Sequence, residues 1–544
     1  MNNLTVNTQQ IISIRDISLL KPTKIKEVKK LVDKYMPDWN YKLPELENPK
    51  VKYLLGISGG VDSSALIAVL LANHPELYGR VTLLFSDTGN EPDSCYGILN
   101  TLEDMFGIPV VQLNDVSLFG EIEKNGGYLP SPKSRWCTSK LKIMPLNNYI
   151  KNNLLTDDKV HVISFSGLRW DERDRMGLIG LDNVTGHFLF IDQKIERPAV
   201  CSLANSLNLM STAYLQGRSR SGCKNCFFSS KQELISLKIW DPKSFHEGET
   251  KEKVAEHILK RLSEDKKLNM RSSGFYTPYP VSELVTKSKD KFSGETLFGQ
   301  ERLDKEGTIT WDYRQAVAGK AKRIKKSQND NQIQLFSAEE DSADVVDTDS
   351  SISLISEEEC ILYVGVENYK HSMMLNDNNH GVWQQRLITF SRTLGGLSRA
   401  LSGYHYHRQM ASRGYFIDED DYNKQSHITV IAIKFAKGII PKIKYGNDSY
   451  TWASGRCYAE LDYIIRCIDR ASEFYISKKL VKEKRVHMIT EQAERFICDW
   501  ERDGKPEVGE ICGIGHYFPK PIKESQFDSY EEDAKTIRCA ICSI

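Results

Sequence analysis

The segment 53–66 constrains the fold of this chain more than any other stretch. The mainly apolar residues 53–57 predict a buried strand, and the Gly59-Gly60 pair predicts a tight turn. Residues 65–71 then predict a helix. Backbone N–H groups at the N-terminus of such a helix attract an anion, and glycine lets the anion approach closely. The segment therefore predicts an anion-binding corner, with an ordinary strand–turn–helix connection as the alternative.

Polar side chains in the same corner suit a phosphate group. Ser58, Ser63 and Ser64 offer hydroxyl donors, and Asp62 can cap the helix or help to hold a metal. Residues 58–63 resemble the S-G-G-x-D-S loop of the ATP-pyrophosphatase superfamily, which includes amidating synthetases, tRNA-thiolating enzymes, phosphoadenosine-phosphosulfate (PAPS) reductases and the ATPase subunit of DNA phosphorothioation systems. The resemblance implies that ATP and Mg²⁺ bind here and that ATP is split between its α- and β-phosphates. The nucleotide-binding residues that it implies are Ser58, Gly59, Gly60, Val61, Asp62, Ser63 and Ser64.

Strands and helices are expected to alternate through residues 50–165. This alternation is typical of a parallel sheet with helices on both faces. The resemblance implies the same architecture, a doubly wound, mostly parallel α/β sheet of the adenine nucleotide alpha hydrolase kind. In such sheets ligands bind beyond the carboxyl ends of the strands, so we expect the chemistry in the loops that follow them. The expected strands are 53–57, 81–86, 109–113 and 160–165, and the expected helices are 24–35, 92–106 and 141–152.

The loop after the second expected strand begins with Asp87, Thr88 and Gly89. It resembles the D-T-G segment of the PAPS-reductase-like branch of the superfamily. It offers a carboxylate, a hydroxyl and a flexible glycine beside the nucleotide site that the resemblance implies. A turn followed by a helix cap is the alternative interpretation.

Two further segments resemble motifs of the same branch. Residues 135–145 match its R-x-C-T-x-x-L-K-x-x-P pattern, and residues 167–172 match G-x-R-x-x-E. Cations near an anion-binding loop suit phosphate or sulfate, and Arg169 suits a bidentate contact. The resemblance implies that Arg135 and Arg169 contact the nucleotide. It also implies that Asp62, Lys142 and Arg169 are catalytic.

A C-x-x-C pair, Cys223 and Cys226, follows a glycine. Two thiolates at this spacing can reach one metal, and two more ligands are needed, for which Cys137 and Cys201 are the nearest in the sequence. A similar G-C-x-x-C occurs in the phosphorothioation ATPases, which implies an iron–sulfur cluster of the [4Fe–4S] type. Zinc, a redox dithiol and packed thiols are the alternatives.

The composition divides the chain into four parts. We expect a helical extension over 1–50, a nucleotide-binding domain with the cysteine cluster over 51–318, a disordered linker over 319–359 and an α+β domain of unknown role over 360–544. The linker begins with a basic run and continues with Asp, Glu and Ser, and it has few large apolar residues.

The linker contains the pentapeptide Gln332-Ile333-Gln334-Leu335-Phe336. It looks like the Q-L-x-L-F peptide by which bacterial proteins bind the replication sliding clamp, and a stray apolar patch is the alternative. The basic run before it can contact nucleic acid, although such runs are usually only solvated.

The last part of the chain resembles no family. Residues 361–366 and 428–435 predict strands, and residues 382–402 and 458–500 predict helices. His405 and His407 have no obvious partner, so we interpret them as structural. Cys512 lies in a segment that faintly resembles the reductase tail with its nucleophilic cysteine, and Cys539 and Cys542 form a second C-x-x-C.

The overall composition excludes several classes of protein. With 73 basic and 73 acidic residues, the chain has no global field that favours nucleic acid or membranes. No apolar run approaches the length of a membrane span, and the polar N-terminus is no signal peptide. Twelve cysteines in so long a chain are no secreted disulfide framework. We therefore expect a cytoplasmic protein.

The leading hypothesis is an ATP-dependent adenylyl-transferring enzyme in sulfur transfer or nucleic-acid modification, including phage defence. Its partners would be an adenine nucleotide, a sulfur donor or proteins of a defence system. A PAPS or adenylyl-sulfate reductase is the first alternative, against which Val61 argues, because sulfur branches usually have Lys there. A non-catalytic nucleotide sensor or scaffold that docks a partner through its linker is the second.

Overall fold

The fold is described from a computed structural model of the chain. The structure describes residues 25–175, 181–263, 301–303, 309–311, 359–370, 383–412, 426–446, 449–452, 456–483, 487–505 and 507–517. The pentapeptide Gln332–Phe336, nearly all of the expected linker, and Cys539 and Cys542 lie outside these residues.

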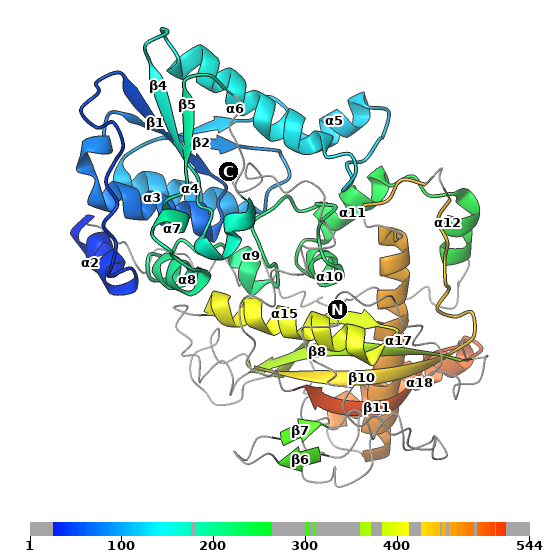
Figure 1. Cartoon of the computed structure of the whole chain (residues 1–544). Helices are drawn as coiled ribbons and strands as arrows, with labels where there is room; N and C mark the ends of the chain where they lie inside the picture. The colour runs from blue at the N-terminus through cyan, green and yellow to red at the C-terminus, as the bar shows by residue number, and fades with distance from the viewer. Residues whose placement is uncertain are drawn as a thin grey trace, which may run out of the picture.

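A five-stranded sheet forms the first region, and all of its strands are parallel (Figure 1). The strand order is β3-β2-β1-β4-β5, so β1 lies at the centre. The chain leaves β1 in one direction to build β2 and β3, and later returns to the other side of β1 with β4 and β5. The strands are β1 (Val51–Ile57), β2 (Val81–Ser86), β3 (Val110–Leu113), β4 (His161–Phe165) and β5 (Val184–His187).

Helices cover both faces of this sheet because the side chains of each strand alternate between the faces. Tyr53 and Leu55 pack into one buried cluster, whereas Leu54 packs into another on the opposite face. Helices α2 (Ile25–Tyr35), α3 (Val61–Asn73), α4 (Asp93–Phe106) and α8 (Arg197–Ser206) contribute to the first cluster. The second is covered by α6 (Met144–Tyr149) and η4 (Ile150–Leu154), which continue the helical segment that begins with η3 (Thr138–Ile143).

A second sheet has four antiparallel strands in the order β11-β10-β8-β9. Helix α15 (Leu394–Ser412) packs through Leu397 and Leu401 on one face, and α17 (Tyr458–Glu483) packs on the other. Helix α18 (His487–Arg502) runs beside α17, where the rings of Phe474 and Trp500 meet. The strands are β8 (Glu359–Lys370), β9 (Trp383–Ser391), β10 (Ser426–Ala436) and β11 (Glu510–Tyr517).

The two regions share a hydrophobic core. Leu234 of α10 (Lys231–Trp240) and Phe245 of α11 (Pro242–Lys251) belong to the same buried cluster as the inner face of the second sheet. The Glu252 carboxylate accepts hydrogen bonds from the backbone N–H groups of Trp452 at 2.9 Å and Tyr458 at 2.6 Å. Burial raises the pKa of Glu252 to about 8.

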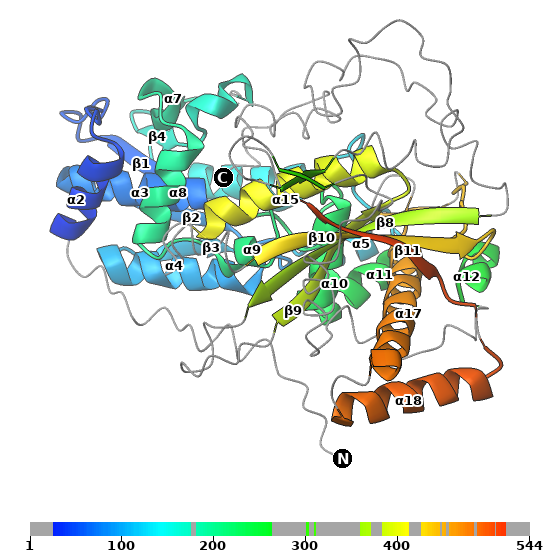
Figure 2. The same ribbon diagram turned by 90° about the horizontal axis from the view of Figure 1, so that it is seen from below.

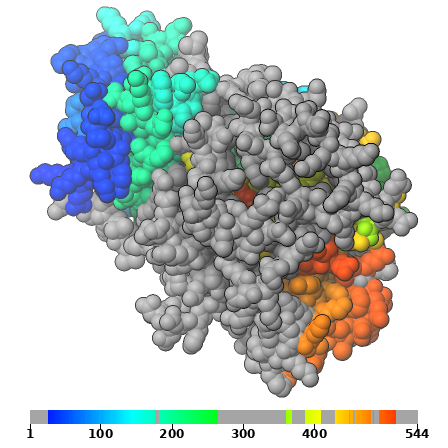
Figure 3. Space-filling model, turned by 60° about the horizontal axis from the view of Figure 1, so that its bottom comes forward, coloured from blue at the N-terminus to red at the C-terminus, as the bar shows by residue number. Residues whose placement is uncertain are grey.

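Helix α15 lies between the second sheet and the helices α8 and α9 (Thr212–Leu215) of the first region (Figures 1 and 2). In the space-filling view, the blue and green residues of the first region and the orange residues near the C-terminus lie at opposite ends of the face (Figure 3). The remaining described elements are η2 (Pro75–Leu77), α5 (Leu118–Lys124), η5 (Trp170–Arg175), α7 (Leu189–Asp192), α12 (Glu256–Ser263) and the pair β6 (Glu301–Leu303) and β7 (Ile309–Trp311).

The coarse α/β prediction is confirmed, and the strand expected over 81–86 has the predicted bounds. The helix predicted over 382–402 is wrong in its first half, because residues 383–391 form β9 and pair with β8. There the apolar residues Leu387 and Phe390 fit a helical spacing, but cross-strand pairing decides the outcome. In the part of the chain that the structure describes, no helix is long and apolar enough to cross a bilayer.

Candidate functional site

The corner after β1 requires its two glycines. Gly59 has φ +65°, and a Cβ there would lie 2.6 Å from the Cβ of Cys95. A Cβ on Gly60 would lie 2.1 Å from the hydroxyl oxygen of Ser221. The chain thus passes very close to α4 and to the segment before the C-x-x-C pair. Only a residue without a side chain fits either position.

The backbone of the corner presents unsatisfied donors. The N–H of Ser58 donates to the hydroxyl of Ser63 at 3.1 Å, and the N–H of Val61 reaches the hydroxyl of Tyr214 at 3.5 Å. Within the residues described, the N–H groups of four others make no hydrogen bond to the protein, namely those of Gly59, Gly60, Asp62 and Ser63. Such donors at the start of a helix as long as α3 provide the positive end of its dipole.

The loop after β4 meets this corner. A Cβ on Gly167 would lie 2.9 Å from the carbonyl carbon of Asp62 and 3.0 Å from the nitrogen of Ser63. Strands β1 and β4 are neighbours on which the chain order reverses, and the crevice at such a point is where open α/β sheets bind ligands.

Arg169 lies in this loop, and its guanidinium is surrounded by carboxylates. Its side chain is only 2% exposed, and Nη1 donates to Oδ1 of Asp62 at 2.7 Å. Nε and Nη2 make a forked contact with Asp171, at 3.0 and 2.8 Å. Glu172 lies 3.3 Å from Nη1. Burial lowers the pKa of Arg169, but these carboxylates raise it more, so the pKa lies well above its ordinary value. The expected bidentate partner, a phosphate, is here replaced by Asp171.

Arg197, at the start of α8, is a second guanidinium at this crevice, and sequence reasoning missed it. Its charge interacts with those of Asp62 and Arg169. Nη2 donates to the carbonyl oxygen of Ser219 at 3.1 Å and lies 3.3 Å from Nδ1 of His407 on α15. Its Nε is buried and has no hydrogen-bond partner among the described residues.

The side chains of the loop after β2 hold that loop and its neighbour in place. The Asp87 carboxylate accepts a hydrogen bond from the N–H of Gly89 at 2.8 Å, within the same turn, and another from the hydroxyl of Tyr96 at 2.9 Å. The buried Thr88 donates to Glu91 at 2.9 Å and contacts the sulfur of Cys223 at 3.3 Å. This loop therefore fixes the position of the C-x-x-C segment.

The structure brings only part of the expected cysteine cluster together. Cys223 lies next to Glu91 and feels the charge of Cys226, and burial, followed by Glu91, raises its pKa well above the ordinary value. Cys201 is buried in the core beside the first sheet, whereas Cys137 packs against the cluster of the second sheet. Among the residues described, no three His, Cys, Asp or Glu side chains form a group that could hold a metal.

The predicted cations on the segment 135–145 lie on the side of the C-x-x-C pair. The guanidinium of Arg135 lies 5.2 Å from the ring centroid of Phe228. Lys142 acts on Cys223 and Cys95, because its charge lowers the pKa of both thiols, against the larger effect of burial. These two cations therefore lie beside the cysteine loop.

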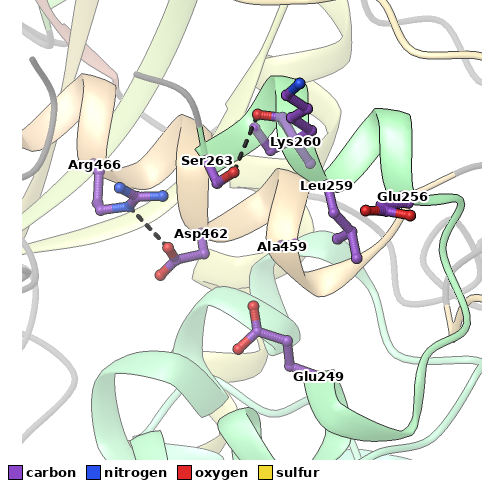
Figure 4. Close-up of a pocket in the computed structure, with 9 residues that line it drawn as sticks. Glu249, Glu256, Leu259, Lys260, Ser263, Ala459, Asp462 and Arg466 are labelled. Atoms are coloured by element: carbon purple, nitrogen blue, oxygen red, sulfur yellow. Dashed lines mark hydrogen bonds and ion pairs between the residues drawn. The ribbon is translucent and has the colours of Figure 1, made fainter. Parts of the chain in front are cut away.

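A separate groove lies where α11, α12 and α17 meet (Figure 4). It is lined by side chains of both charges, and Arg466 donates to Asp462 at 2.8 Å. None of the residues predicted for the site lines this groove. Its lining residues are Glu249, Glu256, Leu259, Lys260, Leu262, Ser263, Ala459, Asp462 and Arg466.

No family model matches the sequence. The chain is similar to two uncharacterized proteins of Methanocaldococcus jannaschii. One is 28% identical over 123 residues, which are 23% of this chain and 24% of that protein. The other is 25% identical over 243 residues, which are 43% of this chain and 55% of that protein. The chain thus spans about a quarter and about half of the length of these two relatives.

Proposed function

We propose that the chain binds ATP at the corner after β1 and transfers its adenylyl group to an acceptor, as the ATP pyrophosphatases of the PAPS-reductase-like branch do. One observation carries the proposal. The N–H groups of Gly59, Gly60, Asp62 and Ser63 have no protein partner among the described residues, and they lie at the start of α3, at the reversal of the strand order. This is an arrangement suited to the oxygens of a pyrophosphate.

The proposed chemistry is a displacement at the α-phosphate. The acceptor forms a bond to the α-phosphorus while the bond to the bridging oxygen of the β-phosphate breaks, and the electron pair leaves with pyrophosphate. The corner would hold the β- and γ-phosphates with its amides and with the hydroxyls of Ser58, Ser63 and Ser64. Lys142 and Arg135 would neutralise charge that develops on the acceptor side. Arg169 would act by orienting Asp62, since it already donates to that carboxylate.

The residues of the corner fit Mg²⁺, because this ion is usually held by one or two carboxylates together with substrate phosphates. Asp62 is the candidate, and its side chain is 33% exposed. When bound, Mg²⁺ would supply positive charge to the phosphates. The described residues do not fit an iron–sulfur cluster, since Cys223 and Cys226 have no two further cysteines beside them, and Cys137 and Cys201 enter different hydrophobic clusters. No step of the proposal involves a cluster.

The wider setting rests on the motif resemblance alone. Within it we propose sulfur transfer or nucleic-acid modification, including phage defence, with a sulfur donor or defence proteins as partners. The reductase alternative needs a thiol at the nucleotide. Cys512 instead lies in β11, where its sulfur donates to the carbonyl oxygen of Ala432 at 3.5 Å within the second sheet.

The test is an incubation with ATP, Mg²⁺ and candidate acceptors, followed by separation of the nucleotides. We expect AMP, or an adenylylated acceptor, together with pyrophosphate. ADP with phosphate would contradict the proposal, and tight nucleotide binding without turnover would support the sensor alternative instead. The matched pair of variants is Gly60→Ala and Gly97→Ala. The first places a methyl group against Ser221 and should abolish activity, whereas the second meets open space on α4 and should retain it.

A further inference from the structure

The two arginines at the crevice differ in how their charge is neutralised. Arg169 has three carboxylates within ion-pairing distance. Arg197 has none among the residues that the structure describes, and its hydrogen-bond partners are a carbonyl oxygen and an imidazole. The charges of both guanidinium groups act on the same carboxylate, Asp62. Of the two, Arg197 is therefore the cation whose charge is left for a ligand.

A guanidinium in this position is costly without an anion. Its Nε is fully buried and has no acceptor among the described residues, so a strong donor has lost water without replacing it. Burial lowers the pKa of Arg197, as does the nearby charge of Arg169, but the charges of Cys201 and Asp62 help to raise it above the ordinary value, so the guanidinium stays charged. A bound phosphate would neutralise the charge and accept the unused hydrogen bond.

His407 fixes the orientation of this guanidinium. Arginine has only donors, so Nδ1 of His407 must accept the hydrogen bond from Nη2, and the ring is neutral with its proton on Nε2. Burial, then the charge of Arg197, lowers the pKa of His407 to about 3, which keeps this state at neutral pH. Tyr404, one turn earlier on α15, lies 2.9 Å from where a Cβ on Gly217 would be. The helix of the second sheet is thus held tightly against the crevice.

We propose that Arg197 is a phosphate-contacting residue of the nucleotide site and that His407 is the residue that positions it. This inference rests on the proposed function and gives the second sheet a role in it. The ligand group is the polyphosphate of the nucleotide rather than its base, since the guanidinium of Arg197 donates to Ser219, in the same short segment as Ser221, which packs against Gly60 of the corner. The site is then built from both regions of the chain, with α15 as the connecting element.

The test compares three probes by titration calorimetry with the full chain, namely ATP, inorganic pyrophosphate and adenosine. We expect Arg197→Ala to weaken ATP and pyrophosphate binding by about 10- to 100-fold and to leave adenosine binding unchanged. Arg197→Lys keeps the positive charge but loses the two-pronged hydrogen bonding of a guanidinium. Its affinity for pyrophosphate should lie between those of wild type and Arg197→Ala. Arg173→Ala removes an exposed cation of the neighbouring segment and is the control, with no expected change.

The role of His407 is tested in the same assay. His407→Ala should weaken pyrophosphate binding by about 2- to 10-fold in the wild-type background and not at all together with Arg197→Ala. His407→Asn places an acceptor where Nδ1 was, and should restore binding. If Arg197→Ala and Arg197→Lys bind pyrophosphate like wild type, or if adenosine binding falls equally, the inference is wrong. If the Arg197 variants bind like wild type but Gly60→Ala no longer binds ATP, the inference about Arg197 is wrong while the proposed function stands. A wild-type chain that binds no adenine nucleotide would overturn both the inference and the proposed function.

Discussion

Each of the two sheets buries a charged cluster, and the clusters are opposite in sign and setting. In the first region, one cation, Arg169, has three carboxylates around it, and one of them, Asp62, is 33% exposed. In the second, one carboxylate, Glu367, is fully buried and pairs with Arg386 and Arg408, while the hydroxyl of Tyr404 donates to it at 2.7 Å.

This difference in exposure distinguishes a cluster that can bind a ligand, around Arg169, from one that only stabilises the fold, around Glu367. Glu367 lies on β8 and is sealed from solvent, and its carboxylate contacts Arg386 of β9 and Tyr404 and Arg408 of α15, so its charge holds these elements together. The Arg169 cluster lies where two loops meet at the end of the first sheet, and Asp62 remains accessible to a ligand. A buried ion pair is therefore not in itself a sign of function. What distinguishes the first cluster is an exposed member next to unsatisfied backbone donors.

The largest effect on stability is expected at Glu367. Glu367→Gln removes the carboxylate that pairs with the buried Arg386 and with Arg408, which should lower the free energy of unfolding by about 3–5 kcal/mol. Denaturant unfolding followed by circular dichroism measures this. Glu359→Gln is the control on the same strand. It breaks a solvent-exposed pair with Lys434 and should cost much less than Glu367→Gln, because water and salt screen such a pair. Equal losses in the two variants would show that burial does not distinguish these pairs.

A smaller effect on stability is expected from lowering the pH, through protonation of His407. The pKa of His407 is lowered to about 3, so between pH 6.5 and 3 the unfolded chain binds a proton that the folded chain does not. The contribution of His407 to the free energy of unfolding is therefore complete above pH 6.5. It is lost as the pH decreases below that value, by up to about 1.4 kcal/mol per pH unit. Arg169 and Arg197 disfavour the charged ring, and Glu233 favours it.

The comparison of wild type with His407→Asn at pH 7.5 and pH 5.5 isolates this group, since the other titrating residues are common to both chains. The variant should lose less stability than wild type over that interval. The neighbouring His405, whose pKa burial lowers to about 4, contributes in the same direction in both proteins. Parallel losses in the two chains would mean that His407 is protonated in the folded state and does not accept from Arg197.

The sequence predicts the elements of the first region well because they are defined by local patterns. The apolar runs of β1, β2 and β4 and the glycine pair at 59–60 each act within a few residues. The positions of the functional side chains depend on longer distances. Arg169 reaches Asp62 across 107 positions, and Arg197 reaches His407 across 210. No spacing in the sequence encodes these contacts.

The second region shows the same limit in its elements. Residues 383–391 carry Leu387 and Phe390 at a spacing that also fits a helix, and only the pairing with β8 makes them a strand. The expected four-cysteine site does not form for a related reason, because Cys137 and Cys201 pack into different hydrophobic clusters. A signal that could have revealed Arg197 is its place directly before a proline at the start of a helix.

The smallest effect on stability is expected at Asp62. Asp62→Asn leaves Arg169 with Asp171 and Glu172, and the lost partner is partly exposed, so the free energy of unfolding should change by about 1 kcal/mol or less. ATP turnover, measured as pyrophosphate release, should instead fall at least about tenfold, because a charge-assisted contact to the metal or phosphates is lost. Asp182→Asn, an exposed change in the same region, is the control. If Asp62→Asn destabilises the protein as much as Glu367→Gln and spares turnover, the Arg169 cluster is a support like its counterpart, and the distinction between the two regions disappears.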